Sequence, residues 1–196
     1  MSTGIIILAA GSSSRLGKPK QLLAYKGKTL LEIATEATLA TNFKPIITVL
    51  GAYADEIART YQNQYITYIV NDSWQEGMAS SISAGLTEVL RQDPTIENII
   101  ITVADQVFLT SELLLNLLIK HQETGKNIIA STYAKTTGTP SLFNKQYFDK
   151  LMALGGNSGA KHILQQHSED MATVDFELGH IDIDTETDYN KLIGQK

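Results

Sequence analysis

Short apolar runs recur along the first two thirds of the chain. Residues 5–8 are an uninterrupted apolar run, which is typical of a strand covered on both faces. Comparable runs rich in β-branched residues predict strands at 46–50, 66–70 and 98–104. Gly11 ends the first run and Gly51 ends the second. The pattern therefore predicts buried strands separated by other elements.

Helices are predicted between these strands. Thr29 and Glu32 have the spacing of a capping box, which marks a helix start. Apolar residues at 30, 33, 34 and 37 follow with helical spacing, so a helix is predicted over 29–41. Further helices are predicted at 54–61, from near Ser80 to Leu90, and at 110–121. The last is apolar nearly all round, which indicates a helix in the interior. Repeated strand–helix units predict a doubly wound α/β sheet, with parallel strands and helices on both faces.

The last third changes character. Residues 138–143 predict a short strand with Pro140 near a sheet edge. Two short helices are expected at 146–153 and 158–166, and short strands near Val174 and at 181–184. Thr185 and Asp188 form a second capping box that begins a C-terminal helix. With no linker, repeat or low-complexity segment in view, one domain over 1–196 is expected.

Composition and charge exclude several classes of function. The 196 residues include no cysteine, which rules out disulfide scaffolds, cysteine-based metal centres and thiol nucleophiles. A net charge of −5 disfavours nucleic acid as the main partner, whereas a small anion needs only a local cluster of donors. No apolar stretch approaches the ~18 residues of a membrane span. The lack of cysteine and of a targeting segment fits a cytoplasmic protein.

The most informative segment follows the first strand and reads LAAGSSSRLGKPK, residues 8–20. Ligands of open α/β sheets bind at this end of a strand, and small residues let backbone N–H groups approach them. Together with the cations Arg15, Lys18 and Lys20, these donors predict a polyphosphate cradle. The alternative is a flexible loop with solvated charges.

Two commoner phosphate motifs do not fit this segment. A P-loop requires four residues between its glycines, but five separate Gly11 from Gly17, and Pro19 follows Lys18. The dinucleotide fingerprint requires a glycine where Ser13 stands. A different kind of phosphate site is therefore indicated.

Acidic residues at two other strand ends are candidate metal ligands. Asp105 follows the strand 98–104, where a Mg²⁺ ligand would lie, although it can also be read as a loop or helix-capping carboxylate. Asp182 and Asp184 alternate along the predicted strand 181–184 and would share one face. A cation would relieve their repulsion; the alternative is an edge strand protected by charge.

The segment 71–81 opens the third predicted helix. N–H groups at a helix start can contact a ligand, whereas Ser80 and Ser81 can equally be explained as helix caps. Neither serine lies in a Gly-x-Ser-x-Gly elbow, so a serine hydrolase is disfavoured.

Taken together, these motifs resemble the nucleotidyltransferases related to the molybdenum-cofactor enzymes, and more closely the molybdenum cofactor cytidylyltransferase branch. The segment 8–20 carries the family signature, and N-x-x-W-x-x-G at 71–77, Asp105-Gln106, Gly138-Thr-Pro140 and Asp182-Ile-Asp-Thr185 recur in order. The similarity runs from about Ile5 to Leu192.

The resemblance implies a single Rossmann-like domain, with three layers and the nucleotide-diphospho-sugar transferase fold, which moves a nucleoside monophosphate from an NTP to a phosphorylated acceptor. Lys20 and Arg15 would hold the triphosphate, Asp105 would hold Mg²⁺, and Asp182 is a second candidate ligand. The nucleotide would be surrounded by residues of three segments: Leu8, Ala9, Ala10, Gly11, Ser12, Lys18, Gly77 and Ser81.

Substrate choice is inferred from the same signature. Ala10, where the guanylyl branch has glycine, favours CTP over GTP, and the implied acceptor is a molybdopterin-type phosphate. Two departures stand out: Val107 replaces a proline of the branch, and Asn157 replaces an aspartate. The alternatives are another NTP, another acceptor such as a sugar phosphate, or a nucleotide-binding regulatory protein without turnover.

Overall fold

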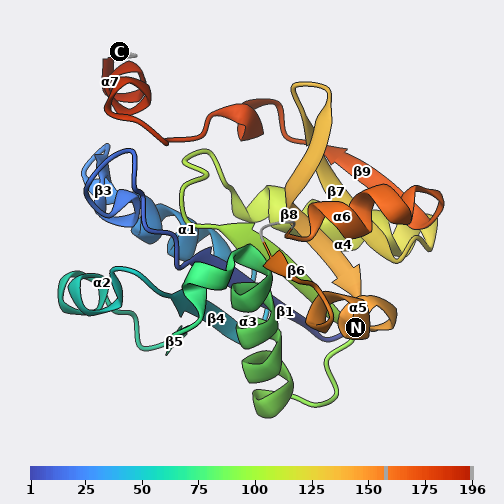
Figure 1. The fold of residues 1–196 in the computed structure, drawn as a ribbon. Coiled ribbons are helices and arrows are strands. Elements are labelled where there is room, and N and C mark those ends of the chain that lie inside the picture. The colour runs from blue at the N-terminus through green and yellow to red at the C-terminus, as the bar shows by residue number, and fades with distance from the viewer. Residues whose placement is uncertain (157–158, 195–196) are drawn as a thin grey trace.

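The computed structural model describes residues 1–156 and 159–194, and within them the strands form one large sheet and one small hairpin (Figure 1). The large sheet has the order β5-β4-β1-β6-β8-β7-β9. Its strands are β1 (Thr3–Ala9), β4 (Ile46–Leu50), β5 (Thr67–Val70), β6 (Asn98–Val103), β7 (Ile128–Tyr133), β8 (Thr136–Asn144) and β9 (Met171–Asp175). The hairpin consists of β2 (Ala24–Tyr25) and β3 (Lys28–Thr29).

All neighbouring strands of the large sheet run parallel except at β8, which is antiparallel to both β6 and β7. The helices are α1 (Leu30–Leu39), α2 (Ala54–Thr60), α3 (Met78–Gln92), α4 (Ser111–Thr124), α5 (Phe148–Met152), α6 (Lys161–Gln166) and α7 (Glu186–Gly194). The predicted α/β class with a mostly parallel sheet is thus confirmed. Among the described helices, none has the length and apolarity needed to cross a membrane.

Alternating side chains of the strands fill two separate cores. In β1, Ile6 and Leu8 join the cluster beneath α3, α5 and α6, whereas Ile5 and Ile7 join the cluster beneath α1, α2 and α4. A strand buried on both faces needs apolar residues at every position, which explains the uninterrupted run in the sequence. A third, smaller cluster lies where α7 meets the start of α1, and contains Leu30 and Leu192.

Two predictions about burial and sheet position are wrong. The helix α4 is not interior, because Leu115 and Ile119 are 37% and 47% exposed on its outer side. The strand containing Pro140 is not an edge strand, because β8 lies between β6 and β7, although β6 pairs only with residues 141–144 and leaves Pro140 beyond its end. The β7–β8 pairing is irregular at Pro140: Ala130 pairs with Ser141, but the next residue, Ser131, pairs with Gly138. Pro140 is therefore skipped in the pairing, which suits a residue that has no backbone N–H to donate.

The C-terminal segment also differs from its prediction. Residues 181–184 are not a strand, so the reading of Asp182 and Asp184 as a protected sheet edge is wrong. Ile183 between them is fully buried in the third cluster, and this burial holds residues 181–184 against that cluster. Both predicted capping boxes are present, at Thr29 with Glu32 and at Thr185 with Asp188. The helix expected from residue 158 begins at Lys161, and residues 157 and 158 lie outside the described residues.

Asp170 fastens the start of β9 to the start of β7, and its removal is expected to lower stability at neutral pH. The carboxylate accepts hydrogen bonds from the Asn127 backbone N–H (3.1 Å), from Asn127 Nδ2 (3.0 Å) and from Tyr147 Oη (2.9 Å). Burial opposes its charged form, but these bonds and the charge of Lys126 outweigh burial and lower the pKa of Asp170.

A lowered carboxyl pKa stabilises the fold above the ordinary aspartate pKa, and this contribution disappears as the pH falls through the lowered value. We therefore expect Asp170→Asn to cost about 1 kcal/mol of unfolding free energy at pH 7, and less at pH 3. Urea unfolding at both pH values measures this, with Asp72→Asn, an exposed loop substitution, as the control. An equal loss at both pH values would contradict the assignment to the charged form.

Candidate active site

A cleft of about 420 Å³ lies at the carboxyl ends of β1 and β6. This is the edge of an open α/β sheet at which ligands bind. The sequence-predicted residues that line it are Leu8, Ala9, Ala10, Gly11, Ser12, Lys20, Gly77, Ser81 and Asp105. Arg15, Lys18 and Asp182 are not among the lining residues. The fold therefore brings together three segments that are far apart in the sequence.

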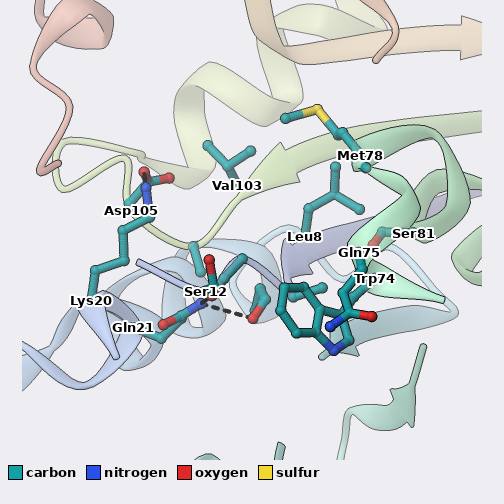
Figure 2. A pocket seen from close by; sticks show the side chains of 15 residues that line it. Leu8, Ser12, Lys20, Gln21, Trp74, Gln75, Met78, Ser81, Val103 and Asp105 are labelled. Atoms are coloured by element: carbon teal, nitrogen blue, oxygen red, sulfur yellow. Dashed lines mark hydrogen bonds and ion pairs between the residues drawn. The ribbon is translucent and has the colours of Figure 1, made fainter. Parts of the chain in front are cut away.

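The loop after β1 is held from behind by Gln21. This side chain is 2% exposed, and its Nε2 donates to the carbonyl oxygens of Ala9 (2.8 Å) and Gly11 (3.3 Å) (Figure 2). The Lys20 backbone N–H donates to Ser13 Oγ at 3.2 Å, which closes the loop. The cleft wall is thus shaped by hydrogen bonds within the protein rather than left as a flexible connection.

Lys20 is the central cation of the site. Its Nζ forms an ion pair with Asp105 and a second with Asp184 Oδ1 at 3.2 Å. Burial disfavours the charged ammonium, but the two carboxylates outweigh burial and raise the pKa of Lys20 above its usual value. Lys20 therefore stays charged at any physiological pH, at the end of the cleft formed by β6.

Asp182 adds a third carboxylate to this region. Burial, followed by repulsion from Asp105, raises the pKa of Asp182 to about 6, although Lys20 acts in the opposite direction. Lys20 and Arg15, which also pairs with Asp184, thus face three acidic groups, and part of the acidic charge is left without compensation. Among the described residues, no group of three or more histidine, aspartate or glutamate side chains is arranged to hold a metal ion by itself.

The other two cations of the loop are paired with the C-terminal segment. Arg15 Nη2 lies 2.7 Å from Asp184 Oδ2, and Lys18 Nζ lies 3.2 Å from Glu186 Oε2. Arg15 is 67% exposed and Lys18 46%, so each pair contributes little to stability. The pairs hold both cations at the rim of the molecule, beside the cleft rather than in its wall.

The segment before α3 forms the opposite wall. Gly77 precedes the helix with φ +106°, a conformation that other residues adopt only under strain. Asn71 Nδ2 donates to Ser80 Oγ (2.9 Å) and Ser81 Oγ (3.0 Å). The helix begins at Met78, two residues earlier than predicted, so Gly77 occupies the N-cap position and no side chain caps the helix. Both serines lie inside the helix, and the interpretation of them as caps is wrong.

Several lining residues were not predicted as site residues, although Trp74 among them belongs to the motif N-x-x-W-x-x-G at 71–77. They are Gln21, Trp74, Gln75, Met78, Val103 and Ala104. Trp74 is the chain's single tryptophan and stands three residues before Gly77, in a loop that follows a strand. A tryptophan at the ligand-binding edge of the sheet is a feature from which the sequence could have predicted a site residue.

Gly51, at the end of β4, is expected to be required for this arrangement. A Cβ there would stand 2.6 Å from the Ala10 carbonyl oxygen and 2.8 Å from Trp74 Cβ, and neither neighbour is a flexible side-chain end. We expect Gly51→Ala to lower the unfolding free energy by about 1–3 kcal/mol and to displace the loop after β1. Chemical denaturation measures the loss. Gly155→Ala, where a Cβ meets nothing within 4 Å, is the matched control, and equal stability of the two variants would refute the expectation.

The comparisons with known proteins agree with this geometry. The model of the MobA-like NTP transferase domain matches residues 5–171. The chain belongs to this family. The predicted relationship to the molybdenum-cofactor nucleotidyltransferases is thereby confirmed at the level of the family.

The proteins whose sequences resemble this chain have different activities, as their names state. Nicotine blue oxidoreductase of Paenarthrobacter nicotinovorans is 35% identical over 118 residues, which are 60% of this chain and 56% of that protein. Molybdenum cofactor cytidylyltransferase of Escherichia coli K12 is 35% identical over 85 residues, 43% of this chain and 44% of that protein. The chain thus matches about half of the length of each.

A solved structure resembles this MobA-like chain over almost its full length. Rv0371c from Mycobacterium tuberculosis H37Rv has a TM-score of 0.86 with 26% identity and covers 99% of this chain and 98% of its own. A second structure of that protein is a complex with manganese; its TM-score is 0.82 with 24% identity, and all of both chains is covered. The fold of this chain is therefore that of Rv0371c over almost its full length.

Proposed function

We propose that this MobA-like chain is a divalent-metal-dependent nucleotidyltransferase that moves CMP from CTP to a phosphorylated acceptor such as molybdopterin, with release of pyrophosphate. The observation that carries the proposal is the Lys20 ammonium held between Asp105 and Asp184 at one end of the cleft behind β1. We propose that residues 1–196 act as one domain in this reaction.

The proposed triphosphate site is the Lys20 end of the cleft. Lys20 is fixed and charged, and residues 9–12 line the adjoining wall, where their backbone N–H groups are the proposed phosphate donors. Arg15 and Lys18 would add charge if a triphosphate replaced Asp184 and Glu186 as their partner. The ribose and base would then occupy the remainder of the cleft, toward Gly77 and Ser81.

The residues present fit a divalent cation. Three carboxylates face two cations, Lys20 and Arg15, and carboxylate oxygens are the ligands that Mg²⁺ and Mn²⁺ favour. Mg²⁺ is usually held by one or two carboxylates and completed by substrate phosphates, so a complete protein cage is not needed. Asp105 and Asp182 are the proposed ligands. A bound metal would neutralise phosphate charge, as manganese bound by Rv0371c suggests for this fold.

The proposed reaction needs no protein nucleophile. A phosphate oxygen of the acceptor attacks the α-phosphorus, a new P–O bond forms, and the bond between the α-phosphorus and the bridging oxygen breaks. The electron pair leaves with pyrophosphate. Both reactants are anions, so charge neutralisation and alignment are the main requirements, and the Lys20 ammonium supplies a fixed positive charge at the reacting phosphates.

CTP is preferred in this proposal because Ala10 follows Ala9 at the cleft wall, as in the cytidylyl branch, and because the similarity to the E. coli cytidylyltransferase supports it. The identity of the acceptor rests on the family resemblance alone. The proposed alternatives remain GTP, a sugar phosphate as acceptor, or nucleotide binding without turnover. Asn157, which raised the last of these, lies outside the described residues.

Oxidoreduction is a second candidate because of the similarity to nicotine blue oxidoreductase over 118 residues. The loop after β1 weighs against a dinucleotide site of the usual kind, since Ser13 stands where the fingerprint requires glycine. The acidic cluster around Lys20 also suits a metal–phosphate complex better than hydride transfer.

One assay separates these functions. The purified chain is incubated with Mg²⁺ or Mn²⁺, each of the four NTPs, and either molybdopterin or a panel of sugar phosphates, while pyrophosphate release is measured. Turnover with CTP and molybdopterin is the expected result. Release only with another acceptor or NTP would replace that part of the proposal, and tight binding without release would indicate a regulatory protein. A parallel incubation contains NADH or NADPH with a quinone-type electron acceptor, and oxidation of the nicotinamide there, without pyrophosphate release in the first incubation, would favour the oxidoreductase.

A further inference from the structure

The cleft has two chemically different ends. Figure 2 shows Lys20 and Asp105 on one side, and Trp74, Met78 and Ser81 on the other. The first end carries fixed charge, whereas the second offers an indole and a thioether. Met78 is 44% exposed although it lines the cleft, so the wall at this end presents uncovered apolar surface.

The backbone of Trp74 is held in place by the protein itself. The absence of a side chain at Gly51 lets Trp74 Cβ pack against the end of β4 beside the Ala10 carbonyl. The Trp74 backbone N–H donates to the Asn71 carbonyl (3.2 Å), and its own carbonyl accepts from the Gly77 N–H (3.2 Å). A short 3₁₀ turn over Trp74–Glu76 thus fixes the backbone from which the indole projects.

A nucleoside triphosphate has the same polarity as the cleft, with an anionic tail and a flat aromatic base. We propose that Trp74 is the stacking platform for the nucleobase, with Met78 completing the apolar wall at that end. The proposal rests on the nucleotidyltransferase function above, and it assigns Trp74 a role in affinity. Stacking accepts any base, because every base has a π-face, so selection of cytosine would remain with the backbone of the loop after β1.

Because Trp74 is the chain's single tryptophan, its fluorescence reports directly on this contact. CTP, UTP, GTP and inorganic tripolyphosphate are each titrated with Mg²⁺, with binding followed by calorimetry and by tryptophan emission on the same samples. We expect every nucleotide that binds to change the emission, and tripolyphosphate to bind without changing it. Calorimetric binding of CTP with unchanged emission would overturn the proposal while leaving the nucleotidyltransferase function intact.

Two variants separate stacking from general damage to the cleft. Trp74→Leu is expected to weaken CTP binding about 5- to 150-fold, the range for losing one base–aromatic stack, and to leave tripolyphosphate binding unchanged. Trp74→Phe, which keeps an aromatic face, should recover most of the CTP affinity. An equal loss for CTP and tripolyphosphate in the leucine variant, or no loss for CTP, would refute stacking. If the unaltered chain binds no nucleoside triphosphate at all, the proposed function itself fails, and this inference fails with it.

Discussion

Replacing Lys20 with alanine is expected to lower the turnover of the proposed reaction by about 10²–10³-fold, the scale for removing one fixed donor that stabilises transition-state charge. Lys20 Nζ is the charge that the fold positions most firmly, because Asp105 and Asp184 hold it from two sides. Negative charge on the leaving pyrophosphate increases during the reaction, so Lys20 stabilises the transition state more than the bound substrate. The decrease in kcat is therefore expected to be larger than any change in KM. Steady-state kinetics with pyrophosphate detection measures both constants.

The Lys20→Ala variant also leaves two carboxylates without their shared cation. We expect a loss of about 1–3 kcal/mol of unfolding free energy, since the group is largely but not fully buried. Thermal unfolding separates this loss of stability from the effect on turnover. Lys20→Arg keeps the positive charge but replaces the ammonium with a guanidinium, so it separates the effect of charge from that of geometry. Lys150→Ala, at an exposed position of α5, is the matched control. Near-normal turnover by folded Lys20→Ala would remove this residue from the proposed mechanism.

The sequence predicted the strands that build the cleft because their signal is local. A strand buried on both faces must be apolar at every position, so β1, β4 and β6 stand out without any knowledge of their neighbours. Parallel connections then place the carboxyl ends of these strands at one edge. For that reason the sequence alone predicts that residues 8–12, Lys20 and Asp105 meet at one edge of the sheet, where they line the cleft.

Features that depend on distant packing could not be predicted in this way. The partners of Arg15 and Lys18 are set by the path of residues 181–186, which follows from the burial of Ile183 rather than from a strand. The interior position of β8 likewise depends on pairing with both β6 and β7, whereas its sequence, with Pro140 inside it, is typical of an edge. Local patterns carry no information about either outcome.

Trp74 shows a third kind of limit. Its place in the wall depends on the missing side chain of Gly51, a residue that the sequence pattern marks only as the end of a strand. Close approach of two segments through a glycine is invisible until both segments are placed. The sequence therefore predicted the charged end of the cleft better than its aromatic end.

Asp105→Asn is expected to reduce metal-dependent turnover by about 10²–10⁴-fold, because a metal ion supplies several kcal/mol of charge stabilisation in phosphoryl transfer and asparagine is a weak ligand. Asparagine keeps the size of the side chain and an oxygen that can accept a hydrogen bond from Lys20, so the fold should survive. Turnover measured against Mg²⁺ and Mn²⁺ concentration should show a higher metal requirement as well as a lower maximum.

Binding of Mn²⁺ gives a readout that is independent of turnover. Electron paramagnetic resonance of free Mn²⁺, in the presence of a non-hydrolysable CTP analogue, should show weaker binding to Asp105→Asn than to the unaltered chain. Asp55→Asn, an exposed carboxylate in the first turn of α2, is the matched control and should behave like the unaltered chain. If Asp105→Asn binds Mn²⁺ normally but turns over slowly, the carboxylate acts by holding Lys20 rather than the metal, and Lys20→Arg should then show a comparable defect. If turnover persists at ordinary metal concentrations, Asp105 is not the ligand, and Asp182, whose pKa is about 6, becomes the remaining candidate of the proposed pair.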